Sequence, residues 1–169
     1  MEGTRLAGEP DFVRSLYMQL YEDGLLLPIA NVAEIVAFAQ PCAYSDAQIP
    51  PWIAGHVGWR GKSLPICALE ASIGATYQPP SVRGRIVVLH GITGSSRLAF
   101  FGVIIQELPV MVLASSASVH WIPSKFNEPV EGNARPHHEF VSGWVDAAGR
   151  DAWIPDLTAI ETEVAASMT

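Results

Sequence analysis

The sequence is poor in charge, and in cations above all. Lysine, arginine, aspartate and glutamate make up 16% of its 169 residues, against about 25% in a typical soluble domain. The 10 cations are outnumbered by 17 acids, which gives a net charge of −7. That balance argues against nucleic-acid binding and against an anionic membrane surface, because both require a basic footprint. Since 49% of the residues are apolar, the chain must bury much of itself or expose apolar surface, as a member of an assembly does.

Cysteine and long hydrophobic runs are also scarce. The two cysteines, Cys42 and Cys67, form no C-x-x-C pair, so we expect both to be reduced and mostly buried. The N-terminus lacks the apolar core of a signal peptide. The longest apolar run, residues 98–105, is too short to span a membrane. We therefore expect a cytoplasmic protein with no direct membrane insertion.

Metal-binding patterns are missing. The five histidines are His56, His90, His120, His137 and His138. The last two are adjacent, so on a strand they would point to opposite faces. The others lack the His-x-His or His-x-x-x-His spacing of a metal site. We expect no pocket that gathers two of them, and no metal.

Patterns for nucleotide binding and nucleophilic catalysis are absent as well. The segment 91–96, GITGSS, lacks the Gly-Lys-Ser/Thr ending of a phosphate loop and reads as a hairpin loop. There is no Gly-x-Ser-x-Gly elbow. The sequence therefore predicts neither an enzyme nor a cofactor.

Short apolar segments separated by glycine and proline predict about nine strands, which favours an all-β barrel or sandwich. Residues 15–21 alternate in polarity as a half-buried strand does, and 22–24 form a hairpin turn before a strand over 25–29. Further strands are expected around 57–59, 64–66, 85–89, 98–105 and 109–113, with a last hairpin around 146–151. Asp156 can cap a terminal helix with Leu157, Ile160 and Val164 on one face.

The domain organisation follows from these segments. Residues 1–11 are expected to be a flexible tail, and 12–169 a single domain. Its subdomains would be 12–64 with the C-terminal helix, and 65–150, with the proline-rich stretch 76–83 as a possible divider. Asn31 and Glu34 could form a capping box for a short helical turn.

The most informative segment is Pro50–Gly74, PPWIAGHVGWRGKSLPICALEASIG. It reads as strand, tight turn, strand and a short helix. Its order of residues resembles the signature of the CheW family, with matches at Gly55, Trp59, Arg60, Gly61, Pro65 and Leu69. His56, Gly58 and Ala68 depart from the family pattern, which has Asp where Ala68 stands.

Two further elements extend the resemblance over about residues 16–113. Residues 31–35 resemble the family's Val-x-Glu-Ile element. Residues 102–105 resemble its Gly-apolar-apolar-Val-Asp element, although Gln106 replaces the Asp. The departures indicate a divergent member, similar to ChpC-like accessories of type IV pilus chemosensory systems that control twitching motility.

The resemblance implies a CheW-like fold of two small five-stranded β-barrel subdomains with short helical turns. It also implies a non-enzymatic adaptor that couples the cytoplasmic tip of a methyl-accepting chemoreceptor to the regulatory domain of a CheA-like histidine kinase. Two alternatives in other classes are a small β-barrel enzyme and an OB-like binding module of unknown ligand.

Five residues are expected at the partner-binding surface. Arg60 lies beside Trp59 at the predicted turn, and arginine next to an aromatic residue is common at interface hot spots. Gly61 allows the turn through positive φ. The resemblance adds Val32 and Glu34, which match the family's kinase-facing element.

Overall fold

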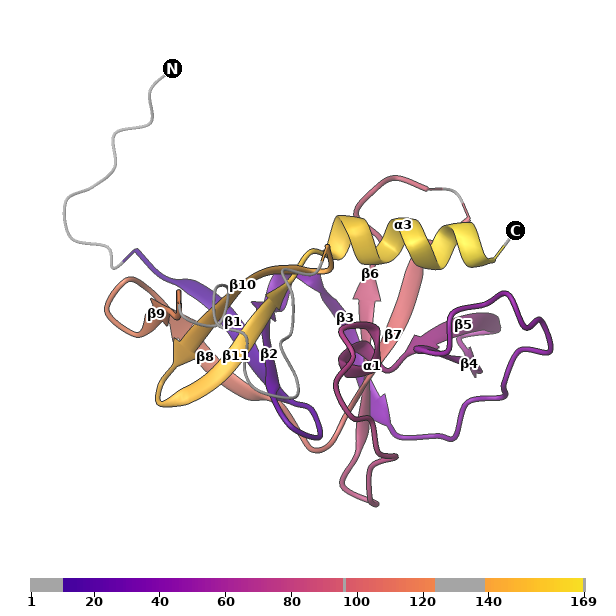
Figure 1. Ribbon diagram of the computed structural model, residues 1–169, viewed down its shortest axis with the longest axis horizontal. Coiled ribbons are helices and arrows are strands. Elements are labelled where there is room, and N and C mark those ends of the chain that lie inside the picture. Colours follow the sequence, from indigo (N-terminus) through magenta and orange to yellow (C-terminus); the bar gives the residue numbers. More distant parts are fainter. Residues whose placement is uncertain (1–10, 96, 124–138, 169) are drawn as a thin grey trace.

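The computed structural model describes residues 11–95, 97–123 and 139–168. Within them, eleven strands form two sheets that lie side by side (Figure 1). The expected all-β class is confirmed. The first sheet has six strands rather than the expected five, while the second has five. No helix in the described ranges has both the length and the apolar character needed to cross a membrane.

Sheet A has the strand order β8-β1-β2-β11-β10-β9. Its strands are β1 (Val13–Gln19), β2 (Gly24–Pro28), β8 (Val110–Ala114), β9 (Val119–Trp121), β10 (Val141–Ala147) and β11 (Arg150–Pro155). All neighbours are antiparallel except β11 and β2, which meet in parallel at Trp153 and Leu25.

Sheet B has the order β3-β6-β7-β5-β4. Its strands are β3 (Val32–Ala37), β4 (Ile53–Trp59), β5 (Lys62–Cys67), β6 (Arg85–His90) and β7 (Phe100–Ile105). A 3-10 turn, Ile29–Asn31, leads into β3, and the short helix α1 (Leu69–Ser72) follows β5.

The sheets divide the chain differently from the expected subdomains. Sheet B is built from residues 32–105, inserted between β2 and β8 of sheet A. The expected boundary after residue 64 therefore falls inside β5. The proline-rich stretch 76–83 joins α1 to β6 within the segment that builds sheet B, so it is not a boundary between subdomains. The signature hairpin β4–β5 lies entirely within sheet B.

The apolar core consists of three clusters, and one of them holds the two sheets together. One lies within sheet B and includes Trp59, Ile66 and Ile104, and a smaller one lies within sheet A around Tyr17 and Val145. The largest is shared, because it contains residues of both sheets and of both α-helices. Burial of this shared cluster fixes one sheet against the other.

Helix α3 (Leu157–Ser167) confirms the sequence prediction for the C-terminus. The Asp156 side chain accepts a hydrogen bond from the Ala159 amide at 3.0 Å, as an N-cap should. Leu157, Ile160 and Val164 are all buried in the shared cluster. In Figure 1 the helix runs across one end of sheet B, and so seals that end.

Three local predictions were wrong. Residues 32–37 form strand β3, not a helical turn, because pairing with β6 outweighs the local capping pattern. Ser15 and Tyr17 are as buried as Leu16, since a cluster lies on each face of β1. Cys42 is exposed, and Cys67 alone is buried.

Some predictions fall on residues that the structure does not describe. The expected tail lies there except for Asp11, as do His137 and His138. The other histidines lie on separate elements: His56 in β4, His90 in β6 and His120 in β9.

Candidate functional site

The tip of the β4–β5 hairpin presents Arg60. Trp59 and Lys62 form the last pair of the ladder, so the turn consists of Arg60 and Gly61 alone. Both have positive φ, 47° and 73°, as a two-residue type I′ turn requires. Glycine adopts this conformation freely, but arginine at positive φ is uncommon. The backbone conformation therefore does not favour an arginine at this position. The reason for Arg60 must lie in the contacts of its side chain.

Glu34 connects this hairpin to the opposite edge of sheet B. Glu34 lies on β3 and Trp59 on β4, and these are the two edge strands. The Trp59 indole Nε1–H donates to Glu34 Oε2 at 2.8 Å. The Arg60 guanidinium lies 3.1 Å from the same oxygen. Sheet B is therefore curved so strongly that its two edge strands meet, and Glu34 joins them through side-chain contacts.

Main-chain hydrogen bonds also join the two edges of sheet B, and we call the line along which these edges meet the seam. Cys42, beyond the end of β3, forms an isolated antiparallel bridge with His56 of β4, with two backbone hydrogen bonds of 2.9 Å. At the neighbouring Gly55, where φ is 142°, a Cβ would collide with the Cys42 carbonyl. The glycine that matches the family signature is thus required by this close approach.

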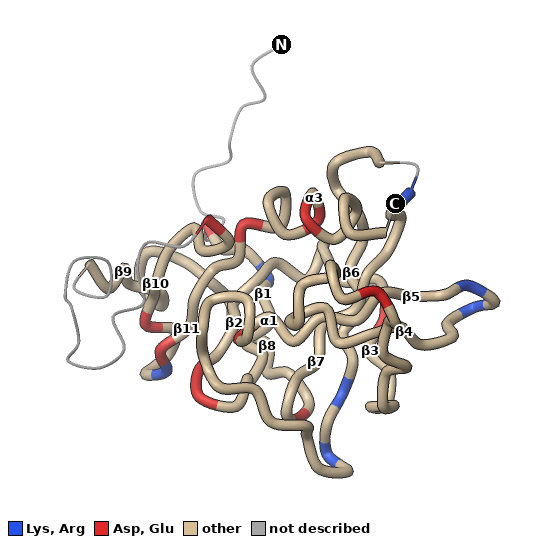
Figure 2. Tube along the Cα trace, turned by 45° about the vertical axis from the view of Figure 1, so that its right-hand side comes forward, with Lys and Arg blue, Asp and Glu red and all other residues tan. Residues whose placement is uncertain are grey.

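The cluster of Glu34, Trp59 and Arg60 is exposed unevenly. Trp59 is 8% exposed, whereas the side chains of Arg60 and Glu34 are 66% and 36% exposed. The Arg60 guanidinium also lies over the indole ring, 4.8 Å from its centroid. An ion pair this accessible contributes about 0–1 kcal/mol to stability. Arg60 is therefore available for another contact, and Figure 2 shows the Lys and Arg positions at the exposed hairpin tip in blue.

Val32 does not join this cluster. A bulge between Val32 and Glu34 shifts the register of β3 against β6. Val32 packs against the shared cluster between the sheets, while Ala33 and Val36 pack against the cluster inside sheet B. Of the five expected site residues, the structure brings together Glu34, Trp59, Arg60 and Gly61, and places Val32 apart from them.

Sequence reasoning missed a second carboxylate contact. Glu161 of α3 is fully buried and accepts from the Ile92 amide at 2.6 Å and from the Thr93 hydroxyl at 2.6 Å. The Thr93 amide is 3.2 Å from both carboxylate oxygens. These bonds attach the loop after β6 to the terminal helix. Their partners are 68 and 69 residues apart, so no local spacing signals them.

Glu70 of α1 is the other acid that is buried in the described part of the chain. It is fully buried, and neither carboxylate oxygen has a hydrogen-bond partner in the described part of the chain. Burial raises its pKa to about 7, and the nearby charge of Asp23 adds to this effect. The amides of Glu70 and Tyr21 oppose the shift in pKa without reaching hydrogen-bond geometry. Glu70 therefore titrates near neutral pH.

The arrangement of side chains around the hairpin suits molecular recognition better than catalysis. One carboxylate is already occupied by an indole and a guanidinium, and no nucleophile stands beside a base among these residues. Across the described ranges, no three His, Cys, Asp or Glu side chains gather as metal ligands would.

Comparison with known proteins places the chain in a family. The family model described as CheW-like domain matches residues 14–164. Among solved structures, the chain is similar to the scaffolding protein TtCheW from Thermoanaerobacter tengcongensis, with a TM-score of 0.66 and 21% sequence identity over 92% of this chain and 91% of that one. No curated protein sequence gives a significant match. Because the family match covers nearly all of the folded chain, this protein belongs to the CheW-like domain family.

Proposed function

We propose that this protein is a non-enzymatic adaptor that couples the cytoplasmic tip of a methyl-accepting chemoreceptor to the regulatory domain of a CheA-like histidine kinase. Membership of the CheW-like family carries the proposal, and the structural similarity to the scaffolding protein TtCheW supports it. The adaptor acts in the cytoplasm and uses no cofactor.

The hairpin tip is the proposed contact for the kinase domain. Arg60, Glu34 and Trp59 form a small polar and aromatic surface in which the guanidinium stays largely exposed. Arginine and tryptophan are the residues that dominate interface energies most often. Gly61 gives the turn its shape, and Val32, partly buried at the start of β3 and apart from the hairpin tip, is proposed as a further contact.

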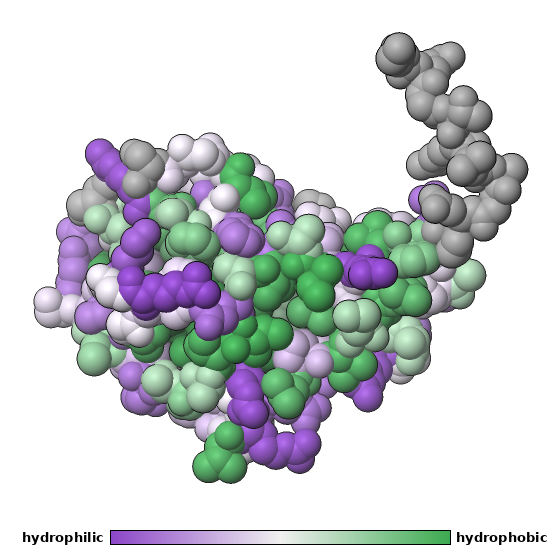
Figure 3. Space-filling view, turned by 180° about the vertical axis from the view of Figure 1, so that it is seen from behind, coloured by the Kyte–Doolittle hydropathy of each residue, from purple (hydrophilic) through white to green (hydrophobic). Residues whose placement is uncertain are grey.

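Sheet A supplies a second proposed contact surface at its open edge. Among the described strands, β8 pairs with β1 alone, and its Val110, Met111 and Leu113 are exposed. Seen from behind, hydrophobic side chains gather over the middle of the molecule and over the half that carries sheet A (Figure 3). An apolar edge strand without charged residues is suited to pairing with a partner.

Two contact surfaces on opposite halves give the adaptor its function. A receptor tip that binds one state of the assembly better than another shifts the population of kinase states, without chemistry in the adaptor. Since the shared cluster holds the two sheets together, a partner on one sheet is held at a fixed position relative to a partner on the other.

We further propose an accessory role in a type IV pilus chemosensory system, with control of twitching motility. The departures from the family pattern at His56, Gly58, Ala68 and Gln106 support it, together with the net charge of −7. A divergent copy of this kind would serve one receptor rather than the general array.

A calorimetric titration tests the adaptor proposal. The full chain is titrated with the regulatory domain of a CheA-like kinase and, separately, with a receptor tip fragment. Arg60→Glu should weaken kinase-domain binding by about 2 kcal/mol, or roughly 30-fold. The free energy of unfolding should change by no more than about 1 kcal/mol. The matched control is Arg83→Glu, which breaks an equally exposed ion pair with Glu107, 3.2 Å long, away from the hairpin.

Absence of binding to both partners would refute the adaptor function. Binding that survives Arg60→Glu unchanged would instead remove the hairpin tip from the interface, and the β8 edge would then be tested through Met111→Glu. If Arg60→Glu unfolds the protein while Arg83→Glu does not, Arg60 is structural.

A further inference from the structure

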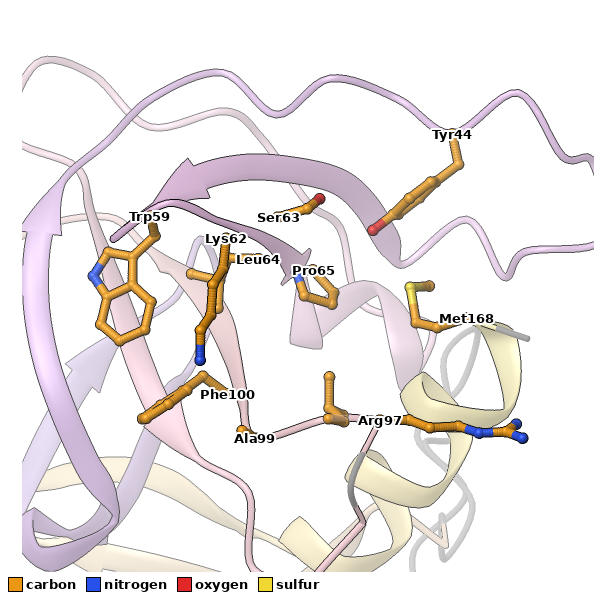
Figure 4. A pocket seen from close by; sticks show the side chains of 11 residues that line it. Tyr44, Trp59, Lys62, Ser63, Leu64, Pro65, Arg97, Ala99, Phe100 and Met168 are labelled. Atoms are coloured by element: carbon orange, nitrogen blue, oxygen red, sulfur yellow. The ribbon is translucent and has the colours of Figure 1, made fainter.

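A groove of about 400 Å³ opens between β5 and the segment that leads into β7. These neighbouring parallel strands pair only at Ile66 with Gly102 and at Cys67 with Val103. Toward their N-terminal ends they diverge, and the groove fills the space between them. Figure 4 shows its floor and walls, with the end of α3 on one side.

The walls of the groove are largely apolar. Trp59 and Phe100 meet edge to face, with ring centroids 4.9 Å apart, at one end. Pro65 and Met168 line the other end, near the last turn of α3 (Figure 4). Aromatic and aliphatic walls of this kind bind a large apolar side chain by removing it from water.

The charged residues of the groove all have one sign. Lys62 and Arg97 line it, and none of the described residues that line it is an acid. The Lys62 ammonium lies 5.8 Å from the centroid of the Phe100 ring, and Figure 4 shows it pointing into the groove, while the Arg97 side chain extends outward on the side of α3. Ion pairs found in the described residues involve Arg60 and Arg83, and neither Lys62 nor Arg97. In a chain with a net charge of −7, the groove is a local site of positive charge.

The backbone beside the groove is open as well. Residues 62–64 of β5 pair with β4 on one side. On the other side, the β5–β7 ladder begins only at Ile66. An extended segment laid along this edge could therefore pair with the main chain, as in strand addition.

From these three features we propose that the groove binds an extended acidic segment of another protein. Acidic side chains of that segment contact Lys62 at one end of the groove and Arg97 at the other, and its large apolar side chains pack against Phe100 at one end and Met168 at the other. A nucleic acid does not suit this groove, because its many phosphates would be repelled by the acidic remainder of the chain. The proposal depends on the groove alone, so it stands whether or not the hairpin tip contacts a kinase.

Selection from a phage-displayed library of random nine-residue peptides on the immobilised full chain tests the proposal. Enriched peptides should combine Asp or Glu with an aromatic or long aliphatic residue. The most enriched peptide is then synthesised with a fluorescent label, and its affinity is measured by polarisation. The double variant Lys62→Glu/Arg97→Glu should bind at least tenfold more weakly, while the control Arg83→Glu should bind as well as the unaltered chain.

Nuclear magnetic resonance locates the bound peptide. Amide signals of residues 62–64 and 98–100 should shift on titration, and those of β8 should not. Failure to enrich acidic peptides, equal weakening by Arg83→Glu, or shifts outside the groove would overturn the proposal. Complete competition by inorganic phosphate would also overturn it, by reducing the site to a general anion site. So would self-association of the full chain that Lys62→Glu/Arg97→Glu abolishes, since the groove would then be an interface between copies.

Discussion

Glu34 accepts a hydrogen bond from the indole of Trp59, and this contact joins the two edge strands of sheet B. The indole is buried, while the carboxylate remains partly accessible on the outside of the seam. One residue therefore serves two requirements: it satisfies a buried donor and holds Arg60 at the surface. The proposed contact surface is also the place where the sheet closes.

Glu34→Ala should destabilise the protein by about 1–3 kcal/mol, because the buried indole N–H loses its acceptor. Glu34→Gln keeps a side-chain oxygen and should recover part of the loss. Urea unfolding measures both effects. Glu107→Ala is the control, since it removes an exposed ion pair with no buried donor, and it should cost less than about 1 kcal/mol. Equal losses for Glu34→Ala and Glu107→Ala would contradict the closing role of Glu34.

Gly55→Ala should be strongly destabilising, by about 2 kcal/mol or more, because the new Cβ meets the Cys42 carbonyl in a backbone conformation that favours glycine. Gly58→Ala, three residues along the same strand, is the matched control, since a Cβ there meets nothing within 4 Å. Thermal melting of the two variants decides the point. Similar melting temperatures would show that the seam can move apart at little cost.

Glu161→Gln should destabilise the protein by about 2–3 kcal/mol. Three donors point at the carboxylate, and an amide group cannot accept from all of them. The same substitution at the exposed neighbour Glu163, Glu163→Gln, should have almost no effect on stability. Hydrogen exchange at the Ile92 and Thr93 amides gives a local measure, and exchange unchanged by Glu161→Gln would show that the loop is held by other contacts.

Glu70 should make the protein less stable as the pH rises. Its folded pKa of about 7 lies above the ordinary value of 4.5, so the folded state binds more protons between these values. Stability is then fully present below about pH 4.5, falls through neutral pH, and is lower by about 3 kcal/mol above pH 8.

Glu70→Gln should therefore match the unaltered protein near pH 5 and exceed its stability at pH 8 by roughly 2 kcal/mol, the remainder being lost to an unpaired buried amide. Melting curves from pH 5 to pH 8 provide the measurement, with Glu163→Gln as the exposed control. Parallel curves for Glu70→Gln and the unaltered chain would show that Glu70 stays charged throughout this range.

Local signals predicted the elements whose causes are local. The existence of strand β1, the Arg60–Gly61 turn and the helix capped by Asp156 follow from residues within a few positions of one another. Four of the five expected contact residues also lie together, although the resemblance supplied Glu34, and chain spacing alone would not have brought it to Trp59.

The errors share a physical origin in pairing between distant segments. Asn31 and Glu34 fit a capping box locally, yet β6 lies more than fifty residues away and draws 32–37 into a strand. Cys42 is exposed, and the bridge that joins it to His56 also links separate segments. The insertion of one sheet into the other is likewise a property of strand order, which no segment carries by itself.

That insertion has a consequence for how the chain is made. Sheet B uses residues 32–105 only, so it has all its strands once Ile105 has emerged from the ribosome. Sheet A needs β11, which pairs with β2, so its first hairpin must wait for Pro155. During synthesis the hairpin of β1 and β2 is therefore left with an unpaired edge beside a sheet that is already complete. In a nascent chain stalled once residue 105 has emerged from the ribosome, sheet B should be protected from protease, whereas β1 and β2 should be cleaved.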